Sequence, residues 1–175
     1  MILDHYAHRP VTLDRSRVYT QPNPDQYQKP RGLWVSVRGD DDWPTWCLGE
    51  DFRIEGLRFA HTVTLAAGSY LRWIRSVPEL DAFHDEYATP SDFDMRYHPD
   101  ERGYWGIDWW QVARCYDGIV IAPYLWERRL SRTCQWYYTW DCASGCIWNL
   151  DAIQSLQLRQ LPALPMGQRD AVIPA

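Results

Sequence analysis

The chain has 175 residues and a formal net charge of −5, with 46% hydrophobic and 23% charged residues. These values are typical of globular proteins and argue against a disordered chain, and no apolar run approaches the roughly 20 residues of a membrane span. The start of the chain has no apolar segment behind a basic one. We therefore expect a cytoplasmic protein without membrane association. Its length fits a single domain, 1–175, with loosely ordered ends at 1–14 and 162–175.

Metal and disulfide chemistry is not favoured by the cysteines. Their number is odd, which argues for reduced thiols, and they stand at positions 47, 115, 134, 142 and 146. Cys142 and Cys146 are spaced C-x3-C with Cys134 eight residues before Cys142, but a C-x-x-C pair is missing and the last histidine is His98. Zinc is thus an alternative that the spacing disfavours.

The first half of the chain is predicted to be loop followed by strands and one helix. The first thirty residues are rich in Pro, Asp, Asn and Gln, broken by one short strand at 16–20. GLWVSV at 32–37 predicts a strand, and Asp42 caps a short helix after it. Alternation of apolar and polar residues predicts strands at 59–66 and 70–74.

The middle of the chain adds helices and a buried strand. Ser76 caps an amphipathic helix of about ten residues. The polar segment 88–104 is predicted to be an exposed loop. Asp108 starts another helix, and the apolar run at 119–122 has the pattern of a central strand.

The last third is dominated by the stretch WYYTWDCASGCIWN, residues 136–149, which sets five aromatic rings around a polar turn. We expect strands at 136–141 and 145–150, then a closing helix over 150–161. One interpretation of the stretch is a buried hairpin. The other is a pocket whose rings stack a planar ligand and whose turn presents Asp141 and Ser144 to it.

A second island of interest is KPRGLWVS, residues 29–36. Trp34 and Ser36 alternate onto one face of the predicted strand, where a ring could stack a ligand and a hydroxyl could bond a sugar. The simpler interpretation is a strand with an outward serine.

Five segments carry a resemblance when taken in chain order: SRVYT, KPRGLWVS, LRWI…VPELDAFHDEY, YDGIVIAPY and IWNLDAI. Together they resemble the ADP-ribosyltransferase superfamily over roughly residues 15 to 155. The resemblance implies an α+β fold, a split β-sandwich of two small mixed sheets with flanking helices. In that superfamily the first strand carries an Arg or His, the second a Ser or Tyr near an aromatic residue, and a late strand a catalytic Glu. NAD would be the substrate, with no metal.

Carried onto this chain, the resemblance places Arg17 at the NAD phosphates or ribose, Ser36 at the nicotinamide ribose, and Trp34 against the nicotinamide. The residues implied in NAD binding are Arg17, Tyr19, Lys29, Trp34, Ser36, Trp46, Tyr138 and Trp140. Ser144 stands where the superfamily has its catalytic Glu. Asp141, three residues earlier, is the candidate for the missing carboxylate, and Glu127 is a poorer one.

The resemblance implies transfer of ADP-ribose from NAD to a macromolecular acceptor, with release of nicotinamide. The acceptor is a nucleic acid or a protein; Arg128, Arg129 and Arg132 would supply phosphate contacts, or they form only a solvated loop. The alternative is a catalytically silent module of the same fold that binds a nucleotide or a protein. A third interpretation places most of the eleven tryptophans in the core.

Overall fold

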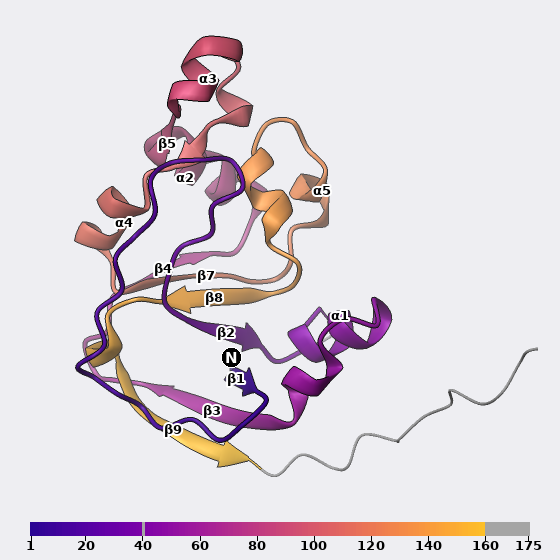
Figure 1. Ribbon diagram of the computed structural model, residues 1–175, viewed down its shortest axis with the longest axis vertical. Helices are drawn as coiled ribbons and strands as arrows, with labels where there is room; N and C mark the ends of the chain where they lie inside the picture. Colours follow the sequence, from indigo (N-terminus) through magenta and orange to yellow (C-terminus); the bar gives the residue numbers. More distant parts are fainter. Residues whose placement is uncertain (40, 160–175) are drawn as a thin grey trace, which may run out of the picture.

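The computed structural model describes residues 1–39 and 41–159, and Figure 1 shows a large mixed sheet with short helices around it. The seven strands of the sheet run in the order β4-β7-β8-β2-β1-β3-β9. Their bounds are β1 (Leu3–Ala7), β2 (Leu33–Val37), β3 (Phe59–Leu65), β4 (Leu71–Ile74), β7 (Gly118–Ile121), β8 (Ser144–Ile147) and β9 (Ile153–Arg159). A separate two-stranded ribbon pairs β5 (Ala88–Thr89) with β6 (Gly106–Ile107).

The main sheet is continuous. β4 and β7 pair in parallel, and the other neighbours in the sheet pair antiparallel. β2 bonds to β8 on one side and to β1 on the other, so one ladder of hydrogen bonds joins both halves. The expected mixture of helices and strands is confirmed, whereas the expected pair of small sheets is replaced by a single sheet of seven strands and the β5–β6 ribbon.

The helices are short, and they are α1 (Trp43–Gly49), α2 (Val77–Tyr87), α3 (Asp92–Tyr97), α4 (Trp109–Cys115) and α5 (Trp126–Arg129). The helices α2, α4 and α5 lie on the side of β4, β7 and β8, α3 stands further out beyond them, and α1 lies near the ends of β1 and β2 (Figure 1). The predicted caps are confirmed: Asp42, Ser76 and Asp108 each accept a hydrogen bond from a backbone N–H in the first turn of α1, α2 and α4.

The predicted strands at 32–37, 59–66, 70–74, 119–122 and 145–150 are confirmed as β2, β3, β4, β7 and β8, and every end lies within three residues of the predicted one. The four residues of β7 are buried and pair on both sides, as a central strand requires. Apolar content and alternation therefore identified these five strands.

Four local predictions were wrong. Residues 16–20 form a loop in which Val18 is largely exposed. Segment 136–141 forms a 3₁₀ helix (Gln135–Thr139), because Trp136, Tyr137 and Trp140 are buried at helical rather than alternating spacing. Part of 88–104 is structured as β5, α3 and the 3₁₀ helix Arg102–Tyr104.

The fourth wrong prediction is the closing helix, of which residues 150–159 are described. They form a 3₁₀ turn (Leu150–Ala152) and then β9, because pairing with the free edge of β3 satisfies the backbone of this segment. The predicted loose end at 162–175 lies outside the described residues. The other predicted loose end, 1–14, contains β1, which pairs on both sides.

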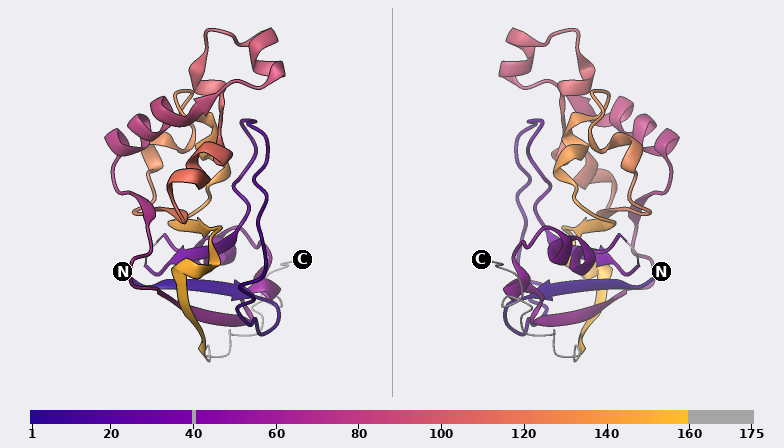
Figure 2. Two further views of the ribbon diagram at one scale, coloured as in Figure 1. Left: turned by 90° about the vertical axis from the view of Figure 1, so that its left-hand side faces the viewer. Right: turned by 90° about the vertical axis from the view of Figure 1, so that its right-hand side faces the viewer.

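A long irregular strap, residues 8–32, connects β1 to β2; it runs away from the sheet and returns (Figure 2). The indole N–H of Trp109 donates to the carbonyl of Gln28 at 3.0 Å. At its end, Gly32 lies so close to β8 that a Cβ would come within 2.6 Å of the Cys146 sulfur. The strap is thus held against α4 and β8 along its returning limb.

The core explains many of the tryptophans. Trp109, Trp136 and Trp140 are almost completely buried and pack edge to face or offset, with ring centroids 5.8 to 6.2 Å apart. Trp148 is buried as well, and Trp73 is partly buried against the core. Several rings nevertheless remain outside, including Trp110 and Trp126.

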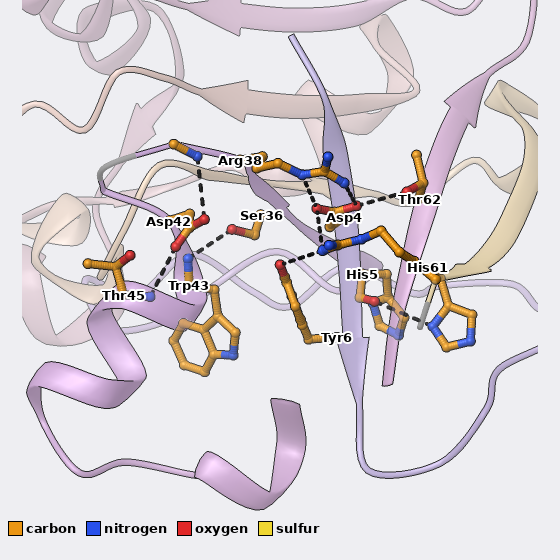
Figure 3. A network of polar contacts seen from close by, with 12 residues as sticks. Asp4, His5, Tyr6, Ser36, Arg38, Asp42, Trp43, Thr45, His61 and Thr62 are labelled. Carbon is orange, nitrogen blue, oxygen red and sulfur yellow. Dashed lines mark hydrogen bonds and ion pairs between the residues drawn. The ribbon is translucent and has the colours of Figure 1, made fainter. Parts of the chain in front are cut away.

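A buried carboxylate joins the strands at the centre of the sheet (Figure 3). Asp4 of β1 is fully buried, and Arg38 donates to both of its oxygens at 2.8 and 2.9 Å. Thr62 of β3 donates at 3.1 Å, and Arg159 of β9 lies 3.4 Å away. Because an unpaired buried charge is strongly destabilising, these partners are what make an aspartate acceptable here.

We predict that Asp4→Ala lowers the free energy of unfolding by about 3 kcal/mol, the low end of the range for breaking a buried pair, because both arginines are about one third exposed. Urea denaturation would measure the change. The matched control is Asp151→Ala, which removes an exposed carboxylate 3.5 Å from Arg15 and should change stability little. Equal effects of the two substitutions would contradict the account.

Candidate functional site

A cavity of about 680 Å³ opens where β1, β2 and the start of β8 meet the loop after α1. This volume is in the range of small-molecule and cofactor sites. Asp4, Tyr6 and Ser36 contribute from the sheet, while Arg53 and Glu55 border the cavity from the loop side.

The structure brings together half of the residues predicted from sequence. Those that line the cavity are Lys29, Trp34, Ser36, Asp141 and Ser144. They come from two islands about 110 residues apart in the chain, the end of the strap with β2 and the segment that leads into β8. The antiparallel pairing of β2 with β8 places the two islands side by side.

The strand register builds a polar row across the floor of the cavity. Asp4 of β1 is paired with Ser36 of β2, and Ser36 is paired with Ser144 of β8. Directly paired residues share one face of a sheet. Trp34, two residues before Ser36, lies on that same face.

The two serines offer different hydrogen-bonding capacity to a ligand. Ser36 Oγ accepts from the backbone N–H of Trp43 at 2.8 Å, so its own proton is free to donate. Ser144 Oγ donates to the carbonyl of Cys142 at 2.9 Å, which leaves its lone pairs to accept. One donor and one acceptor on neighbouring strands suit the hydroxyl groups of a sugar.

The single lysine of the chain lies between the aromatic and the acidic part of the cavity. Lys29 Nζ is 3.2 Å from Asp141 Oδ2 and 5.2 Å from the centroid of the Trp34 ring. Trp34 in turn packs on Trp140, with ring centroids 4.9 Å apart. Asp141 is therefore neither an isolated charge nor a buried one; it is paired and about one quarter exposed.

Sequence reasoning missed His5, because it placed the first strand at 16–20 and assigned the first motif to Arg17. The actual first strand is β1, and His5 on it borders the cavity. Its Nδ1 lies 2.7 Å from the carbonyl of Trp34, which can only accept, so Nδ1 carries the proton and Nε2 offers a lone pair. Burial lowers the pKa of His5, and the neighbouring His61 contributes in the same direction.

Tyr6 and Trp43 were missed as well. Tyr6 lies between the Asp4 network and Trp43 (Figure 3), and its hydroxyl is 3.5 Å from Arg159. Burial, with the charges of Asp4 and Asp42, raises the pKa of Tyr6 to about 12, so its hydroxyl remains a donor at neutral pH. The only sequence signal for this residue was its alternation with Asp4.

The other predicted NAD-binding residues lie elsewhere. Arg17 is exposed in the strap with its guanidinium over the Tyr19 ring. Trp46 stacks on Trp43 at 5.0 Å. Trp140 is fully buried and reaches the cavity only through Trp34, and Tyr138 is 52% exposed on the outer surface.

Tyr138 borders a separate open hollow together with Trp126, Glu127, Arg129, Leu130 and Ser131. Arg129 lies over the Trp126 ring, and the Trp126 N–H donates to Asp41 at 3.2 Å. Arg128 is occupied by Asp81, with which it forms two hydrogen bonds. Glu127 therefore belongs to this hollow and not to the cavity of Asp141.

The five cysteines are free thiols, and all except Cys115 are buried. Burial raises the pKa of Cys134 and Cys142 to about 12 and that of Cys47 to about 11, so these thiols stay protonated at neutral pH. In the part of the chain that the structure describes, no group of three or more His, Cys, Asp or Glu side chains is arranged to hold a metal ion. Within the same residues, no helix has the length and apolar character to cross a membrane.

Comparisons of the chain with protein families, with curated proteins and with solved structures found no match.

We predict that His5 contributes to a loss of stability at mildly acidic pH. Because burial lowers its pKa, the unfolded chain takes up a proton as the pH falls through the ordinary value of about 6.5, while the folded protein resists it. The free energy of unfolding therefore decreases from about pH 7.5 to about pH 5.5, and this decrease should be smaller in His5→Gln.

Urea denaturation at the two pH values would test this. His8→Gln, which changes an exposed histidine three residues later, is the control and should keep the wild-type decrease. Buried His84, whose pKa is also lowered by burial, leaves some pH dependence in every variant. A wild-type decrease in His5→Gln would contradict the role of His5.

Proposed function

We propose that the cavity binds NAD+ and that the protein is an ADP-ribosyltransferase-like enzyme, which moves ADP-ribose to a macromolecular acceptor and releases nicotinamide. The observation that carries the proposal is the meeting of Trp34, Ser36, Ser144 and Asp141 in one cavity, with His5 from the first strand beside them. These residues supply a ring, hydroxyls, a neutral imidazole and a carboxylate, which are the groups that such a substrate requires.

The hydrogen-bonding groups suit a ribose. Ser36 has a proton to donate, whereas Ser144 Oγ and His5 Nε2 have lone pairs to accept from sugar hydroxyls. His5 on the first strand also fits the superfamily pattern of an Arg or His there, which Arg17 does not. Trp34 would face the planar nicotinamide.

The carboxylate suits the bond that breaks. As the bond between ribose C1 and the nicotinamide nitrogen breaks, its electron pair leaves with the nicotinamide, and positive charge develops on the ribose. A carboxylate in a cavity with little water stabilises such charge. Asp141 is the carboxylate from the β8 segment that can act here, in place of the Glu that Ser144 replaces. The acceptor nucleophile then bonds to C1 and loses its proton to solvent.

A macromolecular acceptor fits the hollow around Trp126 and Tyr138. Both rings are about half exposed, and Arg129 is beside them. The hydrogen bond from Trp126 to Asp41 connects this surface to the loop before α1, whose Trp43 borders the cavity. Nucleic-acid bases and protein side chains can both use such rings.

One observation favours a second candidate, a silent binding module. Asp141 is paired with Lys29, and Ser144 brings no charge, so the carboxylate acts on the ribose only if the pair opens. A protein that keeps the pair closed would bind a nucleotide without cleaving it.

We predict that Asp141→Asn lowers the rate of nicotinamide release from NAD+ by about 100-fold or more, the usual cost of removing one electrostatic group from a transition state. Affinity for NAD+ should fall by a smaller factor, because Trp34, Ser36 and Ser144 still line the cavity. Single-turnover release and equilibrium binding would measure the two quantities. Asp151→Asn, an exposed carboxylate outside the cavity, is the control. Unchanged release in Asp141→Asn would remove Asp141 from the mechanism.

We also predict that NAD+ quenches tryptophan fluorescence through Trp34. Trp34→Ala should remove most of the quenching and weaken binding by roughly tenfold, as expected for loss of a stacking ring. Trp110→Ala, which removes a 47% exposed ring outside the cavity, should leave both unchanged. Quenching that survives in Trp34→Ala would show that the ligand stacks elsewhere.

A further inference from the structure

The Lys29 ammonium marks a cation-binding position inside the cavity. It lies 3.2 Å from the Asp141 carboxylate and 5.2 Å from the centre of the Trp34 ring. An aromatic face and a carboxylate that converge on one point form a site for a positive charge of any origin. The protein itself fills the site with the only lysine of the sequence.

The main chain around Lys29 is fixed, whereas its side chain is free to leave. Gln28 O accepts the Trp109 indole N–H at 3.0 Å, and Pro30 O lies 3.6 Å from the Cys146 sulfur. The Lys29 side chain is 37% exposed and has four rotatable methylene groups. Since exposed ion pairs add little stability, the ammonium can exchange the cavity for water at low cost.

We propose that Trp34 and Asp141 form a subsite for a planar, positively charged heteroaromatic ring, and that Lys29 is an internal stand-in which this ring displaces. The proposal rests on the proposed function, because the pyridinium ring of NAD+ belongs to this chemical class. It adds that Lys29 competes with the ligand, whereas the resemblance to the superfamily implied that Lys29 assists binding.

Two consequences follow for the reaction. The subsite favours an oxidised, cationic ring over a reduced, neutral one, because only the cation replaces the charge of Lys29 beside Asp141. When the bond to ribose breaks, the departing nicotinamide becomes neutral and loses this attraction. Lys29 can then return to Trp34 and Asp141, which favours release of the product.

Two small probes test the subsite without relying on turnover: 1-methylnicotinamide, a planar cation, and nicotinamide, its neutral counterpart. Lys29→Gln removes the charge at nearly constant length and should raise the affinity for 1-methylnicotinamide about five- to tenfold, while affinity for nicotinamide changes less than about twofold. Lys29→Arg keeps the charge and should bind like the wild type. Arg31→Gln, an exposed neighbour outside the cavity, is the control. Titration calorimetry would measure all four proteins, with urea midpoints to confirm that each is folded.

Several results would overturn the proposal. A lower or unchanged affinity of Lys29→Gln for 1-methylnicotinamide would show that Lys29 does not compete with it. An equal gain for both probes would show a steric plug without charge selectivity. The subsite and the transferase can fail separately: charge-selective binding without cleavage of NAD+ supports the subsite and refutes the transferase. The converse result is cleavage of NAD+ while both Lys29 variants keep the wild-type rate and affinity. That result supports the transferase and refutes the subsite.

Discussion

The structure depends on the buried carboxylate of Asp4. A charge without water must be paired, and its partners come from the end of β2, from β3 and from the end of β9. These bonds fix β1 between its two neighbours at one register, because a slip of one residue would turn Asp4 to the other face. The same register aligns Asp4 with Ser36 and, through β8, with Ser144. The interaction that holds the centre of the sheet therefore also sets the floor of the cavity.

The parts of the fold that depend on local chemistry could be predicted from sequence. Asp42, Ser76 and Asp108 cap their helices because a side-chain oxygen next to free backbone N–H groups needs no distant partner. β1 could not be recognised in this way, since Asp4 and His5 make it look like a polar end until Arg38 and Arg159 are brought to it. The error at β9 has the same origin: the edge of β3, about 90 residues earlier, decides its conformation.

The residues of the candidate site divide in the same way, into those that a local sequence pattern identifies and those that only the packing of the chain identifies. Lys29, Trp34 and Ser36 were found because they stand close together in a strand-like island, and Asp141 and Ser144 because they interrupt an aromatic stretch. Arg17 was chosen in place of His5 because the first strand was misplaced, and Tyr138 and Trp140 were chosen without knowledge of which rings face solvent, core or cavity. Ring composition predicts stacking capacity, but only packing decides where each ring points.

We propose that this cavity cleaves NAD+ and passes on ADP-ribose, with Ser144 where the resemblance implies a Glu. The most direct measurement is incubation of the protein with NAD+ labelled in its adenylate, alone and with DNA, RNA or cell lysate, following both free nicotinamide and label on the acceptor. The account predicts nicotinamide release together with labelled macromolecule, both lowered about 100-fold or more in the Asp141→Asn variant. Binding of NAD+ without release, with every acceptor, would contradict it and leave a binding module.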